Sequence, residues 1–129
     1  MSIETALYTQ LSGYAGLTDL VSTRIYPLIL PQDCSLPAVT YFRVSGPRIH
    51  AMGSDTGNAM PRFQISCWAS TYSSVKAVAT QVRAALSRLQ DTVDSVVIED
   101  IFIENEMDVY DPDVETYHTS LDFIVMHRE

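Results

Sequence analysis

Residues 63–89 contain the feature that most constrains the fold, a half-buried strand pattern that leads directly into an amphipathic helix pattern. In 63–69, apolar side chains at 63, 65, 67 and 69 alternate with the residues between them, and this period of two places one set on each face of a sheet. Thr71 or Ser73 can then cap a helix through its hydroxyl oxygen. Apolar residues follow at helical spacing: Val75, Val78, Ala79, Val82, Leu86 and Leu89. The pattern predicts a sheet covered by a helix.

Flanking patterns extend this unit in both directions along the chain. A helix capped by Ser2 is predicted to end at Gly13, and Thr18 caps a shorter turn. Three prolines make 27–37 an extended crossing segment. Strands are predicted at 38–44, 96–107 and 116–127, with a polar turn over 108–115. The order α-β-β-α-β-β predicts an α+β fold with one four-stranded, mainly antiparallel sheet and both helices packed on one face. A length of 129 residues predicts a single domain over 1–129.

The segment 45–60 is predicted to be a long loop between the first two strands. It contains Gly46, Pro47, Gly53 and Gly57 and has few apolar anchors. Loops of this length in compact domains are usually functional or mobile. We expect it to be mobile in a single copy and ordered by neighbours, because the entropy cost of ordering it needs contacts to offset it.

Charge divides the chain into two unequal parts, which the net charge of -8 conceals. Residues 1–90 carry seven basic and four acidic side chains, a balance of +3, whereas 91–129 carry one basic and twelve acidic side chains, a balance of -11. Such a division favours head-to-tail contact between copies or attraction to a basic partner. A solvated acidic hairpin that keeps the protein soluble explains the pattern equally well. Direct binding of the acidic part to nucleic-acid phosphates is disfavoured.

Catalysis and metal binding have little support in the residue pattern. Strand alternation would place Glu104, Glu106 and Asp108 in one repelling, solvated row. Without a base, nucleophile or apolar pocket opposite them, a solvated edge is favoured over acid–base catalysis. His118 and Asp122 share a strand face but lie more than ~13 Å apart, which is too far for one metal ion. The sequence predicts no enzyme activity, no metal site and no cofactor.

The two cysteines indicate synthesis in a reducing compartment. Cys34 and Cys67 lack a CxxC spacing, and Cys67 occupies the position of a small core side chain. The first residues have no secretory-signal pattern, and no apolar run is as long as a membrane span. We therefore expect synthesis in the cytoplasm and no membrane partner.

Trp68 falls on the polar phase of its strand, opposite the apolar set that begins at Phe63. An exposed tryptophan there would be a favoured anchor for a protein partner. The alternative is that the proline-rich crossing segment partly covers this second face of the sheet. The sequence leaves both interpretations open.

Several short motifs follow one another along the chain in a definite order. They are ETALY at 4–8, RIYP at 24–27, LPAVTY at 36–41, VSG at 44–46, FQISCWA at 63–69 with Tyr72, ENE at 104–106, YDP at 110–112 and YHTSLDF at 117–123. In this joint order they resemble the small tail-completion proteins of long-tailed bacteriophages and prophages, which are also described as tail-terminator or head–tail joining proteins. The resemblance covers essentially the whole chain.

The resemblance implies a structural virion protein with no catalytic residues to carry over. It implies a ring, commonly of six copies, at the head-proximal end of the tail tube, where the ring ends tube growth and receives the head connector. The implied partners are other copies, the tail-tube protein and the connector, with DNA passing through the lumen without specific binding. The implied location is the tail or neck of the virion, after synthesis in the bacterial host cytoplasm.

Charge and resemblance together suggest which residues make contacts. We expect basic residues of the first part to face the acidic hairpin 99–115 of a neighbouring copy, or a basic connector to face that hairpin. The acids could instead line the ring lumen, where they would repel passing DNA. The candidate interface residues are Arg43, Arg48, Arg62, Trp68, Glu104, Glu106, Asp108 and Asp111.

Two other function classes stay open at this point. A small acidic domain could mimic nucleic acid and inhibit a DNA-binding enzyme, or it could bind a small ligand between helix and sheet as a regulatory domain. Neither class has a positive motif in this chain, and fold alone does not decide between them.

Overall fold

The computed structural model describes residues 3–31, 34–45, 48–51 and 54–128, with side chains described outside 45–59. The helices are α1 (Ile3–Ser12), α2 (Ala15–Val21) and α3 (Tyr72–Leu86). The strands are β1 (Ile25–Pro27), β2 (Ala38–Ser45), β3 (Arg48–Ala51), β4 (Ser54–Ala59), β5 (Arg62–Ala69), β6 (Asp91–Val93), β7 (Val96–Asp111) and β8 (Thr116–Arg128). No helix in this part of the chain is both long and apolar enough to span a membrane.

The strands form one mixed, eight-stranded sheet, so the prediction of a four-stranded, mainly antiparallel sheet is wrong. Along its main path the order is β1-β2-β5-β8-β4-β3, with β7 also pairing with β8, and β6 pairing with β7. The parallel pair β1–β2 makes the sheet mixed. The prediction missed β1 and β6 because a strand of three residues is too short to show an alternating pattern.

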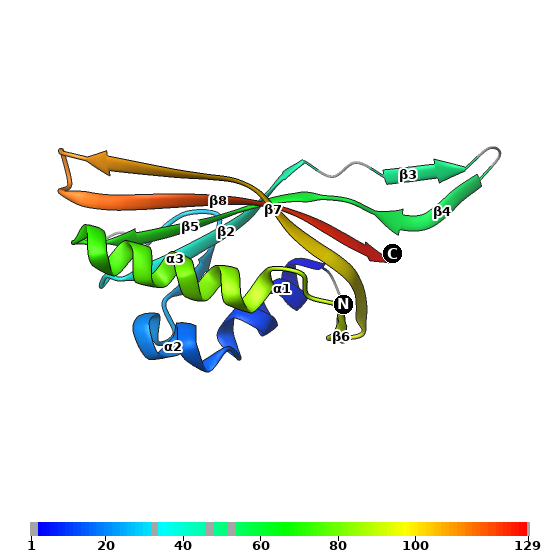
Figure 1. Cartoon of the computed structure of the whole chain (residues 1–129), viewed down its shortest axis with the longest axis horizontal. Helices are drawn as coiled ribbons and strands as arrows, with labels where there is room; N and C mark the ends of the chain where they lie inside the picture. Colours follow the sequence, from blue (N-terminus) through cyan, green and yellow to red (C-terminus); the bar gives the residue numbers. More distant parts are fainter. Residues whose placement is uncertain (1–2, 32–33, 46–47, 52–53, 129) are drawn as a thin grey trace.

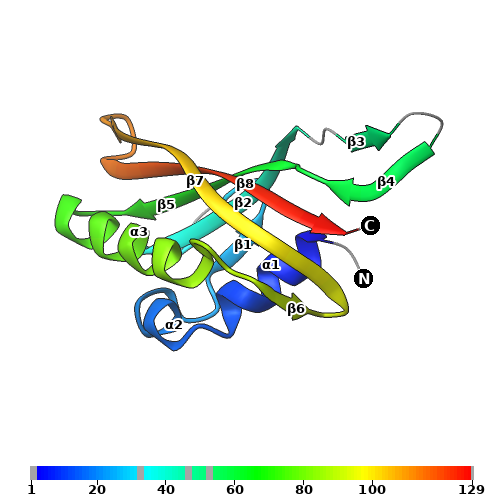
Figure 2. The same ribbon diagram turned by 45° about the vertical axis from the view of Figure 1, so that its right-hand side comes forward.

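Three helices, not two, lie on the same side of the sheet (Figure 1). The sheet curls, so that β6 and the beginning of β7 come round beside α1 (Figure 2). The core lies between these layers, where buried side chains of β5 and β8 meet those of α1 and α3. Its members include Leu7, Leu11, Phe63, Ile65, Val78, Val82, Leu121 and Phe123.

The strand–helix junction forms as its sequence predicts. Phe63, Ile65 and Cys67 are fully buried in β5. Thr71 is the N-cap of α3, and its Oγ1 accepts a hydrogen bond of 3.2 Å from the amide of Ser74. This cap satisfies one of the free amides of the first turn.

The segment predicted as a long loop contains β3 and β4, which we call the arm (residues 48–51 and 54–59). The two strands pair antiparallel and project from one end of the molecule (Figure 1). Near the start of the arm, the β2–β5 register shifts between Arg43 and Ser45. Pro61 separates β4 from β5 and lacks an amide hydrogen, while its carbonyl accepts a hydrogen bond of 3.0 Å from the amide of Val125.

The second long hairpin, β7–β8, ends in what we call the tip (residues 107–116). The tip lies at the opposite end of the long axis from the arm (Figure 1). β7 continues to Asp111, four residues beyond the predicted end of this strand. Residues 108–111 pair with β8 through their backbones, which the polar composition of the segment did not indicate.

Candidate functional site

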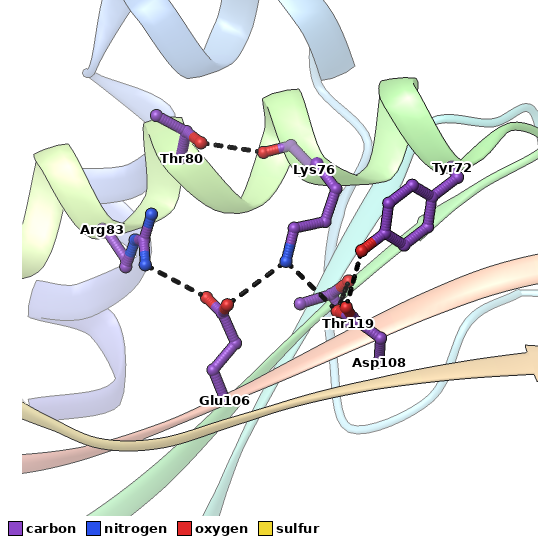
Figure 3. Close-up of polar contacts among 7 residues, drawn as sticks. All are labelled: Tyr72, Lys76, Thr80, Arg83, Glu106, Asp108 and Thr119. Carbon is purple, nitrogen blue, oxygen red and sulfur yellow. Dashed lines mark hydrogen bonds and ion pairs between the residues drawn. The ribbon is translucent and has the colours of Figure 1, made fainter.

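Two acidic side chains of β7 meet two basic side chains of α3 in an ionic cluster (Figure 3). Lys76 Nζ lies 3.2 Å from Glu106 Oε2 and 3.3 Å from Asp108 Oδ1. Arg83 Nη1 lies 3.3 Å from Glu106 Oε1. The Tyr72 hydroxyl donates to Asp108 Oδ2 at 3.0 Å. The cluster therefore joins the helix to the outer half of β7 within one chain.

A register shift in β7 produces this arrangement. The shift lies between Ile103 and Asn105, where Glu104 is the extra residue. Beyond it, Glu106 lies opposite the buried Leu121 and faces α3, as the ion pair with Lys76 requires. Glu104 instead pairs with Arg62 of β5 at 2.8 Å. The single repelling row predicted from strict alternation is wrong for this reason.

The cluster shifts the pKa values of its members in opposite directions. A hydrogen bond of 2.9 Å from Thr119 is the largest influence that holds the pKa of Asp108 below its ordinary value, with further bonds from Tyr72 and Lys76. Burial acts to lower the pKa of Lys76, but the hydrogen bonds to Glu106 and Asp108 outweigh it and raise that pKa. The bond to Asp108 raises the pKa of Tyr72. Each shift favours the charge states that keep the cluster intact.

Trp68 is half-buried on the sheet face that the helices do not cover. Its Nε1–H donates to Thr40 Oγ1 at 3.1 Å. Its ring stacks on His118 with 4.0 Å between centroids and 5° between planes. His118 Nε2 lies 2.9 Å from Ser120 Oγ. Trp68 is therefore held by contacts within its own chain, and its role as a partner anchor stays a prediction.

Among the candidate basic residues with described side chains, Arg43 and Arg62 have different partners. Arg43 pairs with Glu4 of α1 at 2.8 Å and lies 5.6 Å from the centroid of the Phe63 ring. Arg62 of β5 forms an ion pair of 2.8 Å with Glu104 of β7. Arg48 begins β3 in the arm, and its side chain lies outside the described residues. The structure thus brings Arg62 and Glu104 together within one copy.

The tip carries apolar side chains that the sequence interpretation overlooked. Met107 is 54% and Val114 62% exposed, and Val109 and Tyr110 are exposed beside them. An open pocket of about 200 Å³ lies between the tip and the start of α3, lined partly by Val109, Tyr110 and Tyr117. The signal that could have found this surface is the cluster of apolar residues within a segment otherwise read as a polar turn.

Candidate residue Asp111 lies at the edge of this apolar surface. It is exposed, and its Oδ1 accepts a hydrogen bond of 3.0 Å from the amide of Asp113. Asp113 and Glu115 are also exposed, and none of these three acids has an ion pair within the part of the chain that is described. Among the described residues, no group of three His, Cys, Asp or Glu side chains could hold a metal ion. The arrangement is suited to contact with a protein surface.

A family model for tail completion protein gp17 matches residues 5–128. The chain belongs to this tail completion family. Family membership assigns it to the structural proteins of phage tails and confirms the resemblance found in the sequence motifs.

One similar solved structure comes from the virion of a native gene transfer agent (GTA) particle. It matches this tail completion protein with a TM-score of 0.79 at 20% identity. The match covers 99% of this chain and 96% of the chain from the GTA particle. At this identity the likeness shows a shared fold over nearly the full length of both chains. No curated protein sequence matches the chain significantly.

Proposed function

We propose that this tail completion protein ends growth of the tail tube by forming a ring at its head-proximal end. The ring then joins the tail to the head connector and lets DNA pass through its lumen without specific binding. The observation that carries the proposal is the family match over residues 5–128. The ring has six copies, as the family resemblance implies, and its subunits are made in the host cytoplasm.

The shape and charge of the chain support an assembly of this kind. Rings need heterologous contacts, in which one face of each copy meets a different face of the next. The arm and the tip are unlike ends of one elongated molecule (Figure 1). The acids expected to bind a neighbour, Glu104, Glu106 and Asp108, pair within the chain. The contact surface is therefore sought at the tip, where Asp111, Asp113 and Glu115 have no ion pair with any described residue.

Light scattering and electron microscopy test the proposal directly. We expect the purified protein, alone or mixed with its cognate tail-tube protein, to give a ring-sized mass and to cap tubes at one end only. A protein that stays a single copy and neither binds nor caps tubes would contradict the proposal. That outcome would favour an acidic nucleic-acid mimic or a small-ligand-binding domain instead.

A further inference from the structure

We propose that the β7 edge of the sheet in one copy packs against the β1 edge of the sheet in the next copy. The β7 edge is the outer side of residues 99–111, together with the tip and Tyr72 of α3 beside it. The β1 edge is β1 with the turn that follows it, the outer side of β2 after Tyr41, and Tyr8 of α1. The partner at each edge is thus a second copy of this chain. The inference deepens the proposed ring and rests on it.

The two edges bound the same five strands from opposite sides. At the level of the tip the strand order is β1-β2-β5-β8-β7. The registers place Ile25 of β1 and Asp108 of β7 in one row across these strands. No described strand pairs with the outer side of β7 beyond Ile98, or with the outer side of β2 beyond Tyr41. Strand edges of this kind can pair with another chain.

Exposed apolar side chains gather at these two edges. Of the ten large apolar side chains that are exposed among the described residues, nine lie at one edge or the other. Those at the β1 edge are Tyr8, Leu28, Ile29 and Val44, and those at the β7 edge are Tyr72, Met107, Val109, Tyr110 and Val114. The tenth, Val97, lies where β6 pairs with β7. Apolar surface concentrated in this way is typical of contact sites, and here two such sites lie on opposite sides of one sheet.

A strained turn presents the apolar side chains of the β1 edge. Leu28 has a φ of 68°, which is a rare and costly conformation for a bulky side chain. Its amide donates a hydrogen bond of 2.9 Å to the Tyr41 carbonyl, and the amide of Ile29 donates one of 2.8 Å to the Pro27 carbonyl. The turn leaves Leu28 65% and Ile29 72% exposed, more than any other large apolar side chain described. Strain that keeps apolar side chains in solvent points to a partner that covers them.

The β7 edge presents apolar side chains on both faces of the sheet. Val109 lies opposite His118 on the face without helices, and Met107 lies on the same face. Tyr110 lies on the helix face, opposite Tyr117, with 4.7 Å between the ring centroids. A partner on one face of the sheet would cover only one of these sets. A neighbour that meets β7 edge-on contacts both.

Charge selects which edges meet. Asp111 at the β7 edge, and Asp113 and Glu115 in the tip, are exposed and have no ion pair with a described residue. Arg24 immediately precedes β1, and its guanidinium donates to backbone carbonyls at 2.8 and 3.3 Å, with no described carboxylate as partner. The shared row of β1 and β7 puts Arg24 at the height of the tip. Unlike edges therefore attract, whereas two β7 edges would oppose like charges.

A contact between unlike edges is heterologous, because each copy offers a different surface to each of its two neighbours. Repetition of such a contact closes into a ring when the rotation between copies allows it. Blocking one edge of a copy therefore stops growth on that side and leaves the other side able to bind.

Two glutamate variants test the contact. Ile29→Glu alters the β1 edge and Val109→Glu alters the β7 edge, and each leaves the other edge intact. Alone, each variant has to use its altered edge in every contact, so we expect loss of the ring mass in light scattering and of tube capping. In a mixture, the intact β7 edge of the first variant meets the intact β1 edge of the second. We therefore expect the mixture to give a mass of two copies and no ring.

Val97→Glu is the matched control. Val97 is likewise an exposed valine of β7, but it lies in the part that pairs with β6, so we expect this variant to assemble normally. Circular dichroism and urea unfolding establish that each variant folds. If a glutamate variant does not fold, Ile29→Ser or Val109→Thr, which keeps the β-branched shape, takes its place. Where the wild type forms its ring only on tubes, the copies bound at each tube end are counted instead.

The outcomes that would overturn the inference are distinguishable. A ring formed by either glutamate variant alone would exclude its edge from the contact between copies, although the proposed ring would stand. A mixture that stays single, or that grows beyond two copies, would exclude pairing of the β1 edge with the β7 edge. Loss of the ring in Val97→Glu as well would attribute the losses to added charge. A wild-type protein that stays single even on tail tubes would contradict the proposed function and this contact together.

Discussion

Lys76 holds two carboxylates of the facing strand at the same time. Its side chain is 33% exposed, and those of Glu106 and Asp108 are 28% and 38% exposed. An isolated exposed pair of this kind contributes little to stability. Here one cation also relieves the repulsion between two acids two residues apart, and this relief gives Lys76 more weight than an ordinary surface lysine.

We predict that Lys76→Met lowers the free energy of unfolding by roughly 1 kcal/mol, the upper end for exposed pairs. The reason is that Glu106 and Asp108 lose their shared cation. Urea unfolding at neutral pH measures this change. Arg88→Met is the control, because Arg88 is 63% exposed and has one carboxylate partner among the described residues, Asp100, besides a contact of 5.4 Å with the Phe102 ring, and it should cost clearly less. Equal losses in the two variants would contradict the special weight of Lys76.

His118 gives the fold a dependence on mildly acidic pH. Burial beneath the Trp68 stack lowers the pKa of His118 from its ordinary value of 6.5. The unfolded chain therefore takes up the proton first as the pH falls, and stability decreases through pH 6.5 toward the lower folded pKa. The contribution is fully present above about pH 7.

We predict that His118→Gln flattens the stability profile between pH 7 and pH 5. Glutamine keeps a planar group beside Trp68 and can still accept a hydrogen bond from Ser120, but it does not titrate. Thermal unfolding of both proteins across this range measures the difference. A variant that loses stability as steeply as the wild type would show that His118 is not responsible.

At the scale of the elements, the second of two register shifts in β7, at Glu104, lets the residues before it face the core and those after it face α3. Before Glu104, Ile101 and Ile103 face the core, and after it Glu106 and Asp108 face α3. A bulge of one residue lets both sets lie on the same side of the sheet. Deletion of that residue should leave the faces unchanged, whereas deletion beyond it should reverse them.

We predict that deletion of Glu104 is tolerated, with a loss of about 1 kcal/mol or less from the exposed pair with Arg62. Deletion of Met107 should cost more, because it moves Asp108 away from Lys76 and turns Val109 toward the helix. Urea unfolding of the two deletion variants compares them. A greater loss for the Glu104 deletion than for the Met107 deletion would refute this account of the bulge.

The arm is held by fewer strand pairings than the core strands are. Among the described residues, β3 pairs with β4 alone, and β4 meets β8 through two residue pairs, at Asn58 and Ala59. We predict rapid hydrogen exchange of arm amides in single copies and slow exchange in the assembled ring, because neighbours offset the cost of order. β5, paired on both sides, is the internal control. Protection of the arm in single copies would contradict the prediction.

The elements that the sequence predicts well are those whose signal is local. The sequence predicts the strand at 63–69 and a helix capped by Thr71 or Ser73, because alternation, cap and helical spacing all lie within the segment itself, and the structure has Thr71 as the cap. β1, β3 and β4 depend on backbone pairing with distant segments. Such pairing leaves no periodic pattern in a short or glycine-containing strand.

In the candidate site too, the sequence predicts what local alternation determines and misses what depends on pairing between strands. Strand alternation correctly placed Trp68 on the face opposite the core. The bulge at Glu104 could not be read from the sequence, so the partners of Glu106 and Asp108 on α3 were missed. The apolar tip was missed because its residues lie in a strand extension that pairs through the backbone.

At the scale of the whole molecule, the described chain begins and ends on the same side as the arm. The beginning of α1 and the end of β8 both lie toward that end in Figures 1 and 2, whereas the tip lies at the other. A protein partner that approaches the tip therefore meets neither terminus. A partner that approaches the place where β4 of the arm pairs with β8 meets the end of β8 directly.

This placement makes the position of an affinity tag or fusion partner decisive for anyone who purifies the protein. A bulky folded domain fused beyond β8 would stand beside the residues where β8 pairs with the arm, and we predict that it keeps the protein as single folded copies. Cleavage at a protease site in the linker should then release assembly on demand, which light scattering would follow over time. Fusions that assemble as fully as the cleaved protein would contradict this expectation. A cleavable domain fused beyond β8 would thus allow assembly to be started at a chosen time in vitro.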